Sequence, residues 1–91
     1  MQRLHITINA SEGLHARPAH LFCAKAGEFA ADIQVRNLST ESDFVNAKSI
    51  LMILTLGVTQ GHEIEITASG EDESAAIQEI GALIENNFPD E

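Results

Sequence analysis

The stretch 13–19 (GLHARPA) holds the residues whose types and spacing best suit chemistry. Pro18 favours the first turn of a helix, where its missing N–H costs nothing. His15 is therefore expected just before a helix N-terminus, where unpaired backbone N–H groups and the helix dipole favour an anion. Arg17 adds a permanent positive charge. A titratable nucleophilic ring beside an anion site predicts a histidine that carries a phosphoryl group.

Each of these residues also has a simpler interpretation. A lone histidine before a helix is usually a cap or a solvated surface group, and a lone arginine is usually a surface charge. The combination at one strand-to-helix turn carries the hypothesis. His20 follows Arg17 by three residues, so both can lie on one helix face. We keep His20 as a candidate neighbour of the phosphoryl site, beside its interpretation as an exposed polar residue. A metal pair of His15 and His20 is rejected, because other suitable ligands are lacking.

A second stretch, 49–57 (SILMILTLG), is typical of a short helix with too many apolar residues. Ser49 suits the N-cap and Gly57 suits the C-terminal end. A helix of two turns cannot bury the whole apolar run, and an exposed apolar patch on a small acidic protein often marks a docking surface. A fully buried helix or a central strand is the alternative, and the pattern alone favours neither. The residues concerned are Ile50, Leu51, Met52 and Leu54.

Length and charge limit the class of protein. The chain has 91 residues, so we expect one domain spanning 1–91, with a small core and one face open to water. The net charge of −9 disfavours nucleic acid or an anionic membrane as a partner. No apolar run is long enough to span a membrane, and the start is not signal-like. The single cysteine, Cys23, predicts a buried thiol in a cytoplasmic protein.

Apolar residues recur every second position in some segments and every third or fourth in others. The strands are expected at 3–8, 32–38, 43–46 and 62–69, and the helices at 18–28, 50–56 and 72–88. This order predicts an α+β fold, an open-faced two-layer sandwich with three helices on one face of a four-stranded antiparallel sheet. The other face is expected to be wet and to hold Arg3, His5, Thr7, Gln34, Arg36, Glu63, Glu65 and Thr67.

Three motifs together resemble HPr, the histidine phosphocarrier family of the sugar phosphotransferase system. They are 13–19 (GLHARPA), 46–51 (NAKSIL) followed by 55–61 (TLGVTQG), and 68–73 (ASGEDE). The element order agrees over nearly the whole chain. The resemblance implies that Enzyme I phosphorylates His15 at Nδ1 from phosphoenolpyruvate, and that a sugar-specific IIA protein or domain then receives the group. It implies that Arg17 and the backbone at Ala16 and Arg17 stabilise the phosphate.

The resemblance also assigns the second stretch. It implies that Ser49 is a regulatory site for a serine kinase in some bacteria, and that the following apolar segment docks partners. The docking surface would comprise His20, Lys48, Ile50, Leu51, Met52, Leu54 and Thr55. We expect a cytoplasmic monomer without a cofactor or a metal. Such a carrier belongs to a transferase pathway without independent turnover, so its standing as an enzyme stays open.

Some features depart from the simplest HPr proteins. The loop 37–45 is longer, Glu12 replaces a small polar residue, and Met52 and Leu54 make the docking helix more apolar. These features resemble HPr-like domains of fructose-specific multiphosphoryl transfer proteins and the nitrogen-related paralogue, so the branch stays open. Two other functions remain: a regulatory docking module controlled at Ser49, and an unrelated small-molecule-binding sandwich in which His15 is incidental.

Overall fold

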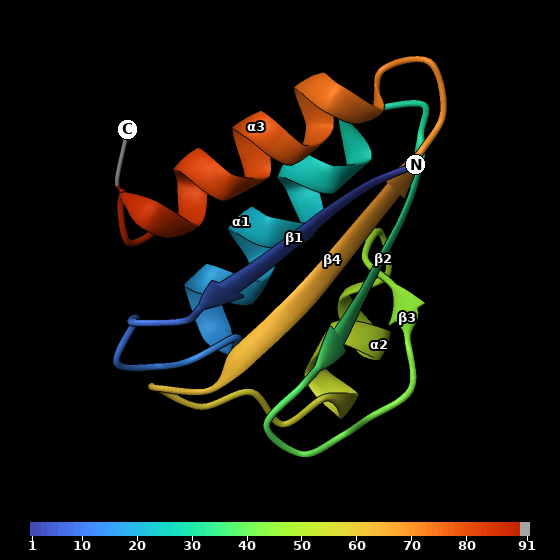
Figure 1. The fold of residues 1–91 in the computed structure, drawn as a ribbon. Helices are drawn as coiled ribbons and strands as arrows, with labels where there is room; N and C mark the ends of the chain where they lie inside the picture. Colours follow the sequence, from blue (N-terminus) through green and yellow to red (C-terminus); the bar gives the residue numbers. More distant parts are fainter. Residues whose placement is uncertain (90–91) are drawn as a thin grey trace.

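The computed structural model describes residues 1–89, with all three helices on one side of a four-stranded sheet (Figure 1). The elements are β1 (Gln2–Thr7), α1 (Ala16–Gly27), β2 (Asp32–Asn37), β3 (Val45–Asn46), α2 (Ile50–Thr55), β4 (Glu63–Ser69) and α3 (Glu73–Glu85). The strand order is β1-β4-β2-β3, and every neighbouring pair is antiparallel. The predicted α+β open-faced sandwich is confirmed. Among the described helices, none has the length and apolar character needed to cross a membrane.

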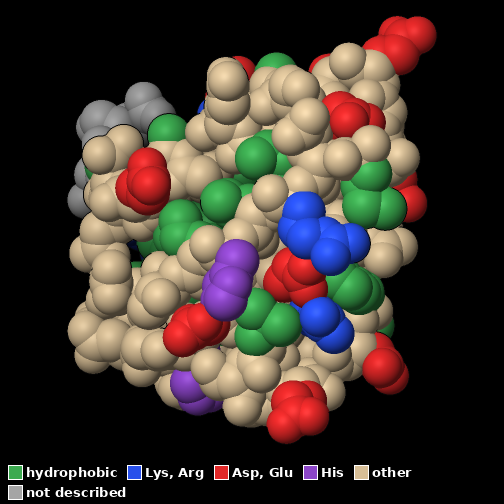
Figure 2. Space-filling model, in the orientation of Figure 1, with side chains coloured by type: hydrophobic (Ala, Val, Ile, Leu, Met, Phe, Trp, Pro, Cys, Tyr) green, Lys and Arg blue, Asp and Glu red, His purple; other side chains and the backbone are tan. Residues whose placement is uncertain are grey.

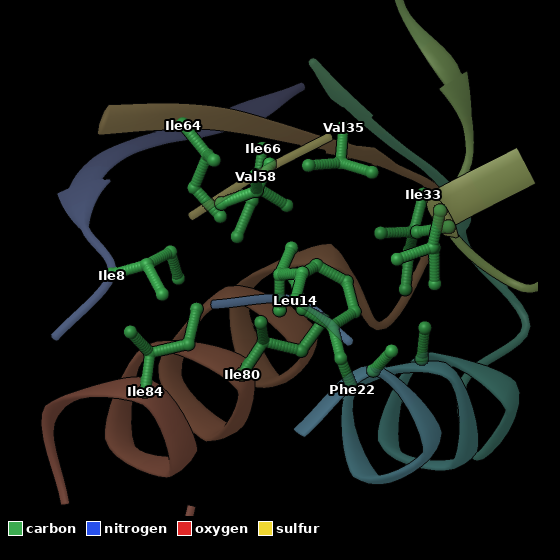
Figure 3. Packing of buried hydrophobic residues seen from close by; sticks show 14 of the residues in the cluster. Ile8, Leu14, Phe22, Ile33, Val35, Val58, Ile64, Ile66, Ile80 and Ile84 are labelled. Carbon is green, nitrogen blue, oxygen red and sulfur yellow. The ribbon is translucent and has the colours of Figure 1, made fainter. Parts of the chain in front are cut away.

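Alternation along the central strand β4 creates the core. Ile66 lies opposite Leu4 of β1 on one side and Val35 of β2 on the other. Apolar side chains of the sheet therefore face the helices, where Phe22 of α1 and Ile80 of α3 are fully buried (Figure 3). Burying one such side chain contributes about 1.5–3 kcal/mol.

Both long helices have boundaries that differ from the predicted ones. α1 begins at Ala16, two residues before Pro18. A proline is tolerated anywhere in the first turn, because no residue there needs an N–H bond within the helix. α3 ends at Glu85, three residues before Phe88, because Asn87 and Phe88 adopt left-handed φ angles of 60° and 53°. Phe88 is nevertheless buried, as its place in the apolar pattern predicts.

The strands differ less from their predicted ranges. β1 shifts by one residue, β4 begins one residue later than expected, and the expected strand 43–46 shortens to Val45–Asn46. Phe44 leaves the strand, and its ring lies 4.9 Å from the Arg36 guanidinium carbon. Cys23, expected to be buried, is half-exposed, and its Sγ lies 3.3 Å from the Lys48 carbonyl oxygen.

The open sheet face is less wet than predicted at its centre, where charged side chains gather (Figure 2). Glu65 is only 7% exposed. Arg36 donates to its Oε1 at 2.7 and 2.8 Å, and Arg3 lies 3.2 Å from its Oε2. The two arginines cover the carboxylate and compensate its desolvation. Next to them His5, exposed as predicted, pairs with Glu63.

Asp72 joins the start of α3 to the connection between α1 and β2. As the N-cap residue it makes no side-chain bond to its own helix. Its carboxylate instead accepts hydrogen bonds from the backbone N–H groups of Ala30 and Ala31, at 2.8 and 2.9 Å. These bonds, chiefly that of Ala30, lower the pKa of the Asp72 carboxyl.

We expect Asp72 to make the free energy of unfolding depend on pH in the acid range. A carboxyl whose pKa is lower in the folded state stabilises the fold above its unfolded pKa of about 3.9, and this contribution is lost as pH falls through the folded value. Asp72→Asn should lower the free energy of unfolding at pH 7 and flatten its decline below about pH 5. Urea unfolding across pH measures both effects. Glu71→Gln, which neutralises an exposed neighbouring carboxyl, is the matched control; an equal effect of both variants would contradict the assignment.

Candidate functional site

The loop before His15 is fixed by backbone contacts with the loop that precedes β4. The N–H of Leu14 donates to the Val58 carbonyl at 3.0 Å, and the N–H of Gly61 donates to the Ile8 carbonyl at 2.8 Å. Gly13 turns the chain with a φ of +65°, in the left-handed region that glycine adopts without strain. Leu14, which follows, is fully buried. The backbone position of His15 is therefore set on both sides, by this loop and by α1.

His15 is the N-cap residue of α1, as predicted. Its backbone is extended, with φ −131° and ψ 166°, and its half-buried side chain makes no cap hydrogen bond. Ala16 then has a φ of +52°. Such a conformation costs a non-glycine residue about 1–3 kcal/mol and is common at functional sites. His15 thus lies at the N-terminus of a 12-residue helix, where first-turn N–H groups can bind an anion.

The other three histidines of the chain have different surroundings. His5 pairs with Glu63, and His20 is exposed on the second turn of α1. His62 Nδ1 lies 3.2 Å from both the Thr59 N–H nitrogen and Asn37 Nδ2. His15 alone combines a helix N-cap with a ring that no group in residues 1–89 hydrogen-bonds. The same described residues contain no cluster of three side chains suited to a metal ion.

Arg17 lies in the first turn of α1, although the predicted range 18–28 placed it just before the helix, and its side chain is exposed. Its Nη2 donates to the backbone carbonyl of Phe88 at 2.9 Å. The guanidinium is therefore held by the segment that follows α3. No sequence pattern signalled this contact, because the two residues are 71 positions apart.

The short helix α2 exposes apolar side chains. Ser49 caps it, with Oγ accepting from the Met52 N–H at 3.4 Å, and Gly57 follows its end with a φ of +61°. Of its residues only Ile53 is buried, whereas Leu51 is 73% exposed. Met52, Leu54 and Thr55 are also exposed, and Ile50 is half-buried. The alternatives of a buried helix and a central strand are wrong.

Lys48 and Asn37 make hydrogen bonds near the two ends of the α2 segment. Lys48 Nζ donates to the Phe29 carbonyl at 2.6 Å, so its ammonium binds the segment that follows α1. Asn37 is fully buried, and its Nδ2 donates to the Leu56 carbonyl at 3.1 Å. That bond satisfies a carbonyl at the C-terminus of α2, where helices lack internal donors. Sequence reasoning missed Asn37, because nothing in the pattern distinguishes a buried asparagine at a strand end from a turn residue.

The chain is similar to curated proteins of two kinds. It is 44% identical over 82 residues to a multiphosphoryl transfer protein of Haemophilus influenzae, covering 90% of this chain and 16% of that protein. A multiphosphoryl transfer protein of Vibrio cholerae is 43% identical over 85% of this chain and 19% of its own length. The chain thus spans less than a fifth of these relatives. The HPr-like protein Crh of Bacillus subtilis is 35% identical, with 93% and 96% covered.

Solved structures agree with the fold. HPr-C-His from Thermoanaerobacter tengcongensis superposes with a TM-score of 0.93 at 43% identity, covering 100% of this chain and 99% of that one. The phosphocarrier protein HPr from Bacillus anthracis gives a TM-score of 0.84 at 35% identity, with 91% and 95% covered. The family model described as the PTS HPr component phosphorylation site matches residues 3–86. The chain therefore belongs to the HPr family of phosphotransferase-system phosphocarriers.

Proposed function

We propose that residues 1–91 act as a single phosphocarrier domain, in which His15 accepts a phosphoryl group from Enzyme I and passes it to a IIA protein or domain. The observation that carries this proposal is the half-buried, unbonded His15 ring at the N-cap of α1. Arg17 in the same turn supplies the positive charge. Membership of the HPr family supports the same chemistry.

The transfer needs little besides positioning and charge. A neutral His15 nitrogen donates its lone pair to phosphorus while the bond from phosphorus to the donor group of Enzyme I breaks, and the reverse exchange occurs with the acceptor. Phosphoryl transfer depends mainly on orientation and electrostatic stabilisation. The helix dipole contributes about 0.3–2 kcal/mol. Such a modest stabilisation suits a carrier, because a carrier must release the group that it accepts.

The test is a mass measurement after incubation with Enzyme I and phosphoenolpyruvate. We expect one added phosphoryl group that is labile in acid, located on His15, and lost when a IIA protein is added. A chain that stays unmodified, while an authentic HPr is labelled in the same mixture, would contradict the carrier function.

A regulatory function controlled at Ser49 is the second candidate. It is favoured by the 35% identity to the HPr-like protein Crh over nearly the full length of both chains. Ser49 is half-exposed at the start of α2, next to the apolar surface. A serine kinase would leave an acid-stable phosphate on Ser49. This label separates the regulatory function from the acid-labile label of the carrier, and a chain with neither label would contradict both functions.

We further propose that the chain is a cytoplasmic monomer. Its net charge of −9 opposes association of identical copies at low ionic strength. A solved HPr from Thermoanaerobacter tengcongensis is described as a dimer, at a TM-score of 0.76 and 42% identity over 99% of this chain and 100% of that one. Light scattering on the peak that elutes from a size-exclusion column measures the molecular mass directly. A dimer mass at micromolar concentration would contradict the proposal.

We expect the exposed apolar residues of α2 to bind partners, Leu51 most of all. Truncating a central contact residue commonly costs about 1–2 kcal/mol, so Leu51→Ser should raise the KM of Enzyme I for this chain about five- to thirtyfold. The melting temperature should change little, because the side chain is 73% exposed. Steady-state transfer assays measure the KM. Ala82→Ser, on the exposed side of α3, is the control; equal KM values in both variants would place the docking surface elsewhere.

A further inference from the structure

The chain makes an unusual turn directly after α3. Asn87 and Phe88 both have left-handed φ angles, 60° and 53°. Consecutive left-handed residues other than glycine persist only where the surroundings force them. Here the N–H groups of Asn87 and Phe88 donate to the carbonyls of Ile84 and Leu83, each at 2.9 Å, and the Phe88 side chain is only 2% exposed. The buried ring and the two hydrogen bonds therefore fix the direction of the Phe88 carbonyl.

That carbonyl accepts the hydrogen bond of Arg17 Nη2 at 2.9 Å. Arg17 belongs to the first turn of α1, beside His15, and its side chain is exposed. A long exposed arginine normally samples many rotamers, and ordering it carries an entropic cost. A fixed acceptor restricts the guanidinium before any phosphoryl group arrives.

We propose that Phe88 is a positioning residue of the phosphoryl site, because its buried ring fixes a carbonyl that presets the Arg17 guanidinium. The inference rests on the proposed function of His15 as phosphoryl acceptor. The Phe88 side chain lies in the core, so it is not accessible to a phosphoryl group or a partner. It acts on the transfer step through Arg17, by reducing the ordering that remains to be done when charge develops.

The kinetic test uses Phe88→Ala in transfer from Enzyme I. We expect kcat to fall about five- to tenfold, near the net scale of one hydrogen bond, while the KM stays constant because α2 is unchanged. In an Arg17→Ala background, the same Phe88 substitution should have no further effect on kcat. Additive losses in the double variant would overturn the proposal, because Phe88 would then act without Arg17.

Matched variants separate positioning from general destabilisation. Ile84→Ala removes another core side chain of α3, 3% exposed, and should leave kcat per folded molecule unchanged. Phe88→Leu keeps an apolar side chain in the core and should restore most of the rate. If Phe88→Ala is unfolded at the assay temperature, Asn87→Pro replaces it, since proline cannot adopt the left-handed φ that directs the carbonyl. A normal kcat in the folded variant would overturn the proposal.

Nitrogen NMR of the arginine side chains provides a readout that needs no transfer. Slow rotation should give separate Nη signals for Arg17 in the unmodified chain, and these should merge in Phe88→Ala but not in Ile84→Ala. Unchanged Arg17 signals in Phe88→Ala would contradict the positioning role. A chain that shows these spectra but accepts no phosphoryl group would contradict the carrier function and leave the Phe88–Arg17 contact established.

Discussion

His15→Ala is expected to abolish phosphoryl acceptance and to leave the fold intact. The side chain makes no cap hydrogen bond and is half-exposed, so its removal should cost less than about 1 kcal/mol of stability. Without the ring nitrogen there is no nucleophile for phosphorus, so the transfer rate should fall to the background of the assay. Intact mass after incubation with Enzyme I and phosphoenolpyruvate measures acceptance, and thermal unfolding measures stability.

His20→Ala is the control for this experiment, because His20 is the other histidine on α1 and is also exposed. It should keep the acid-labile label, even if docking weakens. Retained labelling in His15→Ala would place the phosphoryl group on another side chain. Loss of the label from His20→Ala as well would point to a docking defect. A labelling series at rising Enzyme I concentration identifies it, because a docking defect is overcome at high Enzyme I concentration and the loss of the phosphoryl acceptor is not.

Short-range patterns predicted most of the fold and the location of the candidate site. Strand alternation and helical spacing depend on residues a few positions apart, and they gave all seven elements in the correct order. The placement of His15 before α1 follows from Pro18 and Gly13, both within three residues. The apolar run alone left an exposed α2 surface and a buried segment equally open, and the resemblance to HPr favoured the exposed surface.

The contacts that hold the site are long-range, and no local pattern predicts them. Arg17 reaches the Phe88 carbonyl, and Lys48 reaches the Phe29 carbonyl. Backbone carbonyls accept from these side chains, so the identity of the accepting residue gives no chemical signal. The burial of Glu65 also depends on long-range contacts, because Arg3 and Arg36 come from strands on opposite sides of β4. Sheet order, rather than strand propensity, brings the three charges together.

Gly13→Ala is expected to cause the largest loss of stability among the predicted variants. A Cβ at this position would lie 2.1 Å from the Val58 carbonyl oxygen and 2.7 Å from the Thr59 Cα, and both are backbone atoms that cannot rotate away. The φ of +65° adds the strain of a left-handed residue. Strain and overpacking together should cost about 3 kcal/mol or more, which lowers the melting temperature by roughly 12–24 °C in a domain of this size.

The same substitution should also slow phosphoryl acceptance per folded molecule, because the loop 8–14 must move away from Val58 and carries His15 with it. Gly27→Ala is the matched control: a Cβ there meets no atom within 4 Å, and the residue ends α1. It should be neutral or stabilise by up to about 1 kcal/mol, through the higher helix propensity of alanine. Calorimetry of both variants measures the two melting temperatures. Equal melting temperatures would show that the Gly13 turn does not depend on close contact with Val58, and that the His15 loop is held by other means.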